Sequence, residues 1–127
     1  KDRVLVNALL TNKLFSVPIG KDGNAGTTTE VKLDRPLERP DGMRSFGTDS
    51  LLVVEGGGGG RLSRVDLDGD TGKVSTIKEG FPGGPVGVAV VGSTAYVLEG
   101  QLMLLMRPSP DAKATPFHAI AVPVGKP

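Results

Sequence analysis

The chain has 127 residues, with 15 Lys and Arg against 14 Asp and Glu, so its formal net charge is only +1. A chain of this length usually forms one domain, and a balanced charge without a basic run gives no indication of nucleic-acid binding. The absence of cysteine excludes disulfide bonds, a thiolate nucleophile and a cysteine metal site, and it is compatible with an exported or a cytosolic location.

The apolar runs are short. The longest are Leu51–Val54, Val88–Val91 and Leu102–Met106, well below the roughly 18 residues that a membrane helix requires. We therefore expect no membrane partner. The chain starts with Lys1-Asp2 and reaches an apolar segment at Val4, so we expect a strand at its very start and a processed or truncated product.

Short apolar segments that end at Gly, Pro, Asp or Asn follow one another along the chain, as is typical of strands. Phe15, Val17 and Ile19 alternate with polar or proline positions, which predicts a half-buried strand, and Leu51–Val54 is apolar throughout, which predicts a strand covered on both faces. Gln101–Arg107 comes nearest to a helix but is too short. In chain order, the predicted strands are Val4–Leu10, Lys13–Ile19, Thr28–Leu33, Met43–Phe46, Leu51–Glu55, Arg61–Leu67, Val74–Lys78, Val86–Val91, Thr94–Glu99, Leu102–Met106 and Phe117–Val122.

Two segments of the chain resemble each other at a nearly constant distance. Glu55-Gly56 recurs as Glu99-Gly100 after 44 residues, and Pro40–Met43 recurs as Pro85–Val88 after 45 residues. A fixed internal period indicates one supersecondary unit stacked on copies of itself. Counting from each Pro-x-Gly predicts four strands per unit, with a partial unit at about residues 1–38 and full units at 39–83 and 84–127.

Four-stranded units in tandem are typical of β-propeller blades. We therefore predict an all-β chain that forms a single segment of a six-bladed β-propeller, with about 2.75 four-stranded blades in residues 1–127. Propellers close with about four to eight blades, so the open ends of this segment would expose apolar faces and drive association. The predicted partner is another copy of the chain or a missing N-terminal half; a compact two-sheet sandwich is the alternative.

Asp41 is the first candidate site residue, because the second repeat has Val86 at its position. It opens the strand that would line the channel of a propeller. Glu55 ends the following strand and Asn7 ends the matching strand of the preceding unit, so antiparallel pairing should bring all three to one face. Such oxygen ligands suit a hard divalent cation, so the predicted metal ligands are Asp41, Glu55 and Asn7. The alternatives are an Asp that bonds its own turn and two residues of the rim.

Other candidates are weaker. Gly56–Gly60 lacks the Lys and the helix of a phosphate-binding loop, and we expect a mobile rim loop on the face of Asp41. His118 is the only histidine and falls in the last, outer strand, where a surface position is expected. Arg35, Arg39 and Arg44 flank the Asp41 turn and would balance its charge, attract an anionic sugar acid, or be solvated.

The order of these segments resembles the senescence marker protein/gluconolactonase/luciferin-regenerating enzyme family. The resemblance rests on Asp34–Met43, which closes with Arg39-Pro40-Asp41-Gly42-Met43, and on the segments that follow it in order: Leu51–Glu55, Arg61–Leu67 and Asp70-Thr71-Gly72. It extends from about Val4 to Val122. It implies the C-terminal half of a six-bladed propeller.

The resemblance also implies an activity. Members of that family hydrolyse sugar lactones or related esters with one divalent metal ion, often calcium or zinc, in the channel. The Asp of Pro-Asp-Gly is a metal ligand and a proton-transfer group in that family, which makes Asp41 the expected catalytic residue here. The other family ligands would precede Lys1, so the expected site is incomplete. The expected small-molecule partner is a lactone or a sugar acid, and the alternative is a non-catalytic propeller that binds a ligand or a protein.

Overall fold

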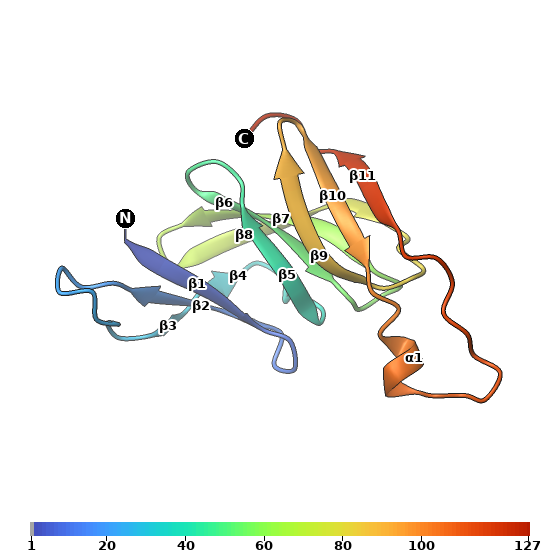
Figure 1. Ribbon diagram of the computed structural model, residues 1–127. Helices are drawn as coiled ribbons and strands as arrows, with labels where there is room; N and C mark the ends of the chain where they lie inside the picture. The colour runs from blue at the N-terminus through green and yellow to red at the C-terminus, as the bar shows by residue number, and fades with distance from the viewer. Residues whose placement is uncertain (1) are drawn as a thin grey trace.

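The computed structural model describes residues 2–127 and confirms the all-β prediction. The strands form three sheets, shown in Figure 1. Their bounds are β1 (Arg3–Ala8), β2 (Lys13–Pro18) and β3 (Thr29–Glu30) in the first; β4 (Lys32–Leu33), β5 (Pro40–Ser45), β6 (Ser50–Glu55), β7 (Arg61–Asp68) and β8 (Thr71–Glu79) in the second; and β9 (Pro85–Val91), β10 (Thr94–Glu99) and β11 (Ala119–Pro123) in the third.

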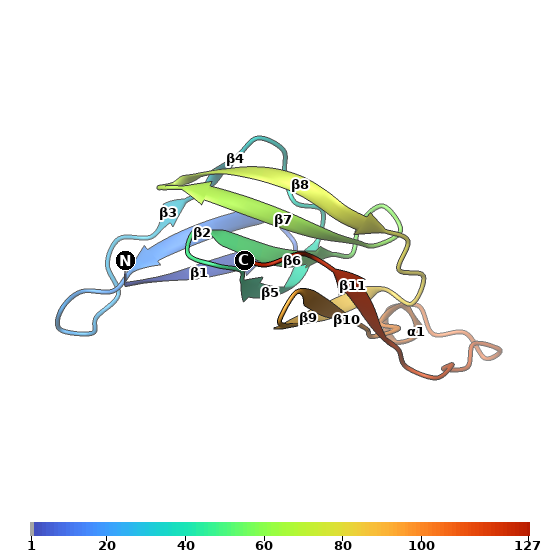
Figure 2. The same ribbon diagram turned by 90° about the horizontal axis from the view of Figure 1, so that it is seen from above.

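The second sheet lies between the other two (Figures 1 and 2). Its strand β6 is buried on both faces. Leu51 and Val53 pack in one apolar cluster with residues of the first sheet, such as Leu14. Leu52 and Val54 pack in the other cluster with residues of the third sheet. Because successive side chains of a strand point to opposite faces, the apolar run 51–54 supplies both interfaces, as its composition predicts.

The predicted count of four strands per unit is wrong for the sheets as they form. They contain three, five and three strands, in the orders β1-β2-β3, β4-β8-β7-β6-β5 and β11-β10-β9. The predicted strand Thr28–Leu33 is divided at the buried Val31, so that β3 pairs with β2 and β4 pairs in parallel with β8. The linker between two units thus ties the first sheet to the second. The sandwich alternative would have two sheets instead of the three seen here.

The predicted strand Leu102–Met106 is also wrong. Residues Met103–Met106 form one helical turn, α1, closed by bonds from the Met106 N–H to the Leu102 carbonyl (3.0 Å) and from the Arg107 N–H to the Met103 carbonyl (2.9 Å). Met and Leu are unbranched at Cβ and favour a helix where no neighbouring strand pairs with them. β11 therefore pairs directly with β10. No helix in residues 2–127 has the length and apolar character to cross a membrane.

The half-buried strand β2 presents the opposite face to the one expected. Leu14 and Ser16 are buried, whereas Phe15 and Val17 are only partly covered and Ile19 is exposed. The more apolar side of this strand faces away from the second sheet. Alternation reveals that two faces differ, but only the packing of the sheets decides which face is covered.

The internal repeat extends to the backbone geometry. Arg39 and Gly84, each before a Pro-x-Gly, both have positive φ, 53° and 74°. The Arg39 carbonyl accepts a bond from the Gly56 N–H (3.0 Å), and the Gly84 carbonyl accepts one from the Gly100 N–H (2.9 Å). In both units the ladder shifts register immediately after the proline, so Asp41 and its counterpart lie in equivalent β-bulges, a feature that re-aims side chains.

Gly42, the glycine of the first Pro-x-Gly, allows β5 and β9 to approach each other. A Cβ built on Gly42 would lie 2.6 Å from the Gly87 Cα and 2.7 Å from the Val86 carbonyl oxygen. Both obstacles are backbone atoms, so a side chain at position 42 would have to separate the strands. Gly42 is therefore a packing requirement at the contact between the first strands of two units.

Candidate functional site

Asp41 lies near the start of β5 and lines a small cavity of about 80 Å³. Its walls are mostly apolar and include Leu9, Val86, Leu102 and Met106. Burial raises the pKa of the Asp41 carboxyl, because a charged group is less stable away from water. Among residues 2–127 no ion pair within 4 Å reaches this carboxylate. Asp41 is therefore a partly desolvated, uncompensated acid.

Asn7 lies beside Asp41, as predicted. The Asn7 side-chain amide donates a hydrogen bond of 2.6 Å to the backbone carbonyl of Asp41. This bond connects β1 of the first sheet to the bulge in β5 and fixes the position of Asp41. Asn7 thus contacts Asp41 through a bond to the Asp41 backbone. The role of Asn7 as a metal ligand stays a prediction.

Glu55 lies at the same end of the sheet as Asp41, since it pairs with Pro40, but its carboxylate has partners of its own. The Glu55 carboxylate is fully buried and accepts two bonds from the Arg35 guanidinium (3.1 and 3.0 Å), one from the Ser63 hydroxyl (2.5 Å) and one from the Glu38 N–H (2.6 Å). These bonds fix the linker between the first two sheets to the end of β6. They already use both carboxylate oxygens.

A divalent metal ion at Asp41 stays a prediction. Residues 2–127 contain no group of three or more His, Cys, Asp or Glu side chains placed to hold one. Of the three predicted ligands, Asp41 has an uncompensated carboxylate, and Glu55 is paired with Arg35. Because calcium takes about six to eight oxygen ligands and zinc about four ligands, a metal at Asp41 would need ligands from outside this chain.

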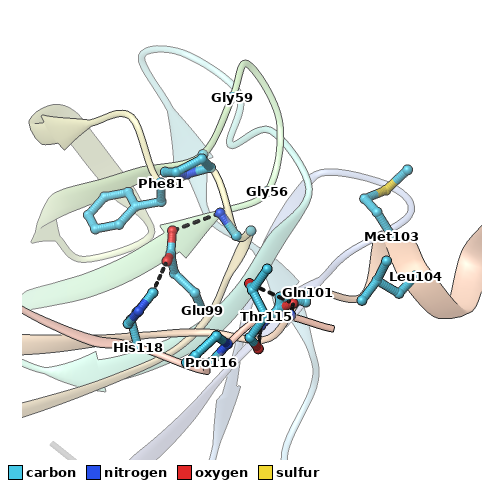
Figure 3. A pocket seen from close by; sticks show the side chains of 14 residues that line it. Gly56, Gly59, Phe81, Glu99, Gln101, Met103, Leu104, Thr115, Pro116 and His118 are labelled. Carbon is cyan, nitrogen blue, oxygen red and sulfur yellow. Dashed lines mark hydrogen bonds and ion pairs between the residues drawn. The ribbon is translucent and has the colours of Figure 1, made fainter. Parts of the chain in front are cut away.

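A larger cavity, of about 530 Å³, is drawn in Figure 3. It shares Gly56, Gly84 and Met103 with the Asp41 cavity. Glu99 is its only acidic side chain, and His118 is its only histidine. The Glu99 carboxylate is almost completely buried, accepts a bond of 2.8 Å from the Gly83 N–H, and lies 3.7 Å from the exposed His118 Nδ1. A buried carboxylate with one short bond thus faces a cavity large enough for a small ligand.

Sequence reasoning used Glu99 only as a marker of the repeat and assigned it no function. A signal was available, because the 45-residue offset between the two Pro-x-Gly segments puts Gly80, which has no side chain, at the place of Arg35. His118 is exposed, as expected, and its carbonyl accepts the Glu99 N–H at 3.0 Å. The glycine loop 56–60 borders both cavities and is held by a bond from the Gly57 N–H to the Glu38 carbonyl.

The chain matches no known protein family, no curated protein and no solved structure.

Proposed function

We propose that the three sheets are consecutive blades of a six-bladed β-propeller that further blades complete. Two apolar sheet faces support this proposal. On the first sheet, Val4 and Val6 are exposed, and they pair across the strands with Val17 and Phe15. On the third sheet, Val91, Tyr96 and Leu98 are exposed. Such faces at both ends of a stack are what an open arc of blades presents.

In a solution of this chain the further blades would come from a second copy. Sedimentation velocity should then detect a dimer whose population rises with protein concentration. Val6→Lys and Tyr96→Lys, which place charges on the two faces, should each shift the chain toward monomer, whereas Thr48→Lys in an exposed loop should not. A chain that stays monomeric at all concentrations would leave a missing N-terminal half as the source of the blades.

We further propose that Asp41 transfers protons in the hydrolysis of a sugar lactone or a related ester. The observation that supports this proposal is the Asp41 carboxylate, which has no ion-pair partner within 4 Å in the described residues and lies in a mostly apolar cavity at the start of β5. A raised pKa makes a carboxylate a better base near neutral pH. Asp41 would accept a proton from the water that attacks the carbonyl carbon and return it to the ring oxygen as the acyl C–O bond breaks.

The remaining parts of such a site would lie outside this chain. The cavity at Asp41 has room for only a few water molecules, so further blades would have to enclose the substrate. A divalent ion, calcium or zinc, would polarise the lactone carbonyl when bound, and Asp41 would be one of its ligands. Residues of this chain hold Asp41 in place through the Asn7 amide and keep its cavity apolar.

A lactone assay tests this proposal directly. Asp41→Asn should abolish hydrolysis, a chelator should reduce the rate of the unsubstituted chain, and Asp49→Asn, an exposed control, should behave like that chain. Calcium or zinc should raise the melting temperature of the unsubstituted chain but not that of Asp41→Asn. Hydrolysis by Asp41→Asn at the full rate would overturn the proposal. No metal shift and no hydrolysis would favour the alternative, a non-catalytic binding propeller.

A further inference from the structure

The end of β10 repeats the carboxylate site at the end of β6. In each unit a glutamate ends the second strand and accepts a bond from the backbone N–H two residues before the Pro-x-Gly: Glu55 from Glu38 (2.6 Å) and Glu99 from Gly83 (2.8 Å). Both carboxylates are buried. Each glutamate pairs across the strands with the proline of its own Pro-x-Gly, Glu55 with Pro40 and Glu99 with Pro85. The two sites therefore share their backbone framework.

The two sites differ in the cations beside the carboxylate, which at Glu55 are Arg35 and, at 3.5 Å, the Arg61 Nε. Three residues before the N–H donor, the first site has Arg35, whose guanidinium makes a two-pronged contact with Glu55. At the same spacing the second site has Gly80, which has no side chain and a φ of 80° that disfavours other residues. The Glu99 site thus lacks an internal guanidinium.

The place beside Glu99 is a cavity, and its walls are held in position. The 530 Å³ cavity is lined by Gly83, Glu99 and His118. On one wall the Gln101 side chain donates to the Thr115 carbonyl (2.9 Å) and accepts from the Thr115 N–H (3.0 Å), which fixes the segment that leads to His118. Figure 3 shows the Glu99 carboxylate between Phe81 and His118. Little ordering is then needed when a ligand binds.

His118 is the one basic side chain within 4 Å of the Glu99 carboxylate in the described part of the chain. Its Nδ1 is 3.7 Å away and its side chain is largely exposed, so it does not replace the short, paired contacts that Arg35 makes. A guanidinium matches a carboxylate with two parallel N–H bonds, which a histidine or an ammonium does not.

We propose that the Glu99 cavity binds the guanidinium group of a ligand, in the position that Arg35 occupies beside Glu55. The ligand class is a small guanidinium compound of the size of arginine, either free or as the arginine side chain of a peptide. The inference uses neither the acid at position 41 nor a metal, so it is independent of the proposed hydrolysis.

The test is a titration of the 127-residue chain with methylguanidinium, with methylurea as the uncharged control of the same shape. Binding is followed by calorimetry and by the NMR shift of the Gly83 amide, which bonds to Glu99. We expect methylguanidinium to saturate a single site and to shift this amide, and methylurea to bind at least about tenfold more weakly, because a charged hydrogen-bond pair is lost.

Two variants decide between the site and nonspecific binding. Glu99→Gln should weaken methylguanidinium binding by about tenfold or more, whereas Glu30→Gln, at an exposed glutamate of β3 outside this cavity, should bind like the unsubstituted chain. Amide spectra verify that both variants are folded; if Glu99→Gln does not fold, methylurea and the Gly83 shift still decide. Equal binding of methylurea, or unchanged binding by a folded Glu99→Gln, would overturn the proposal.

A comparison of free arginine with N-acetyl-arginine amide distinguishes the two sources of the guanidinium. Tighter binding of free arginine would identify a free ligand. Tighter binding of N-acetyl-arginine amide would identify the arginine side chain of a peptide.

Discussion

The carboxylates of Glu55 and Glu99 occupy equivalent backbone sites with opposite surroundings. Glu55 is enclosed by Arg35, Ser63 and a backbone N–H, whereas Glu99 has one short backbone bond and faces a cavity. The backbone of the repeat places a buried acid at the end of the second strand in both units. The side chains around it, which in the first unit are Arg35, Ser63 and Arg61, then determine whether that acid ties two sheets together or faces a cavity.

The largest expected effect is on stability, and it separates the two acids. Glu55→Gln should lower the free energy of unfolding by about 3–5 kcal/mol, because it leaves the Arg35 guanidinium without its buried partner. Glu99→Gln should cost less than about 1 kcal/mol, since its ion-pair partner His118 is exposed to solvent. Urea unfolding of the two variants gives both values, and equal costs would contradict the comparison.

A second variant removes the two-pronged guanidinium contact from the closed site. Arg35→Ala should lower the free energy of unfolding by about 3 kcal/mol, because the buried Glu55 loses its main partner. Methylguanidinium, well below denaturing concentrations, should restore part of this loss, and methylurea should not. The measurement is the melting temperature with each compound; Arg39→Ala, an exposed arginine of the same linker, is the matched control. No recovery would mean that an external guanidinium cannot replace Arg35.

The framework that both sites share can be tested at Gly42. Gly42→Ala should destabilise the protein by about 1–3 kcal/mol, because the added methyl group meets the backbone of β9 and cannot be accommodated by a side-chain rotation. Gly56→Ala is the control, since its nearest contact would be 3.6 Å and its φ is not positive. Chemical denaturation measures both, and a neutral Gly42→Ala would show that β5 and β9 are not packed this closely.

Acid should weaken the closed site over a defined range of pH. Burial by itself raises the pKa of Glu55, but the hydrogen bonds from Arg35, Ser63 and the Glu38 N–H outweigh it, so the net pKa lies below its ordinary value. Stability from a lowered pKa is complete above the unfolded value, about 4.3, and is lost as the pH falls through the folded value.

Urea unfolding between pH 7 and pH 2.5 checks this range. The unsubstituted chain should lose this contribution below about pH 4.3. Glu55→Gln should show a flatter pH dependence there. Identical pH profiles for the two proteins would remove Glu55 as a source of acid sensitivity.

The smallest expected effect concerns Asp41, whose pKa shift has the opposite sign. Burial raises the pKa of Asp41, so its contribution to stability is complete below its unfolded pKa, about 3.9, and is lost as the pH rises through the folded value. Asp41→Asn should therefore melt slightly above the unsubstituted chain at pH 7, and this difference should disappear near pH 3. A lower melting temperature at pH 7 would indicate that the charged form is stabilised by a partner.

The sequence by itself determined the all-β class, the internal repeat and the two-faced burial of Leu51–Val54. These follow from local chemistry: strands need apolar alternation or runs, turns need Gly, Asp or Pro, and a repeated Pro-x-Gly reproduces the same bulge. Antiparallel pairing also placed Glu55 at the same end of the sheet as Asp41.

Only the tertiary structure decided which partners the acids have. Arg35 is 20 residues from Glu55 in the chain, and no local pattern indicates that its guanidinium reaches that carboxylate instead of Asp41. The division of Thr28–Leu33 between two sheets and the helical turn at Met103–Met106 likewise depend on which neighbouring strand is available for pairing. Backbone pairing and long-range ion pairs form between segments that are distant in sequence, so their outcome depends on how the three sheets pack.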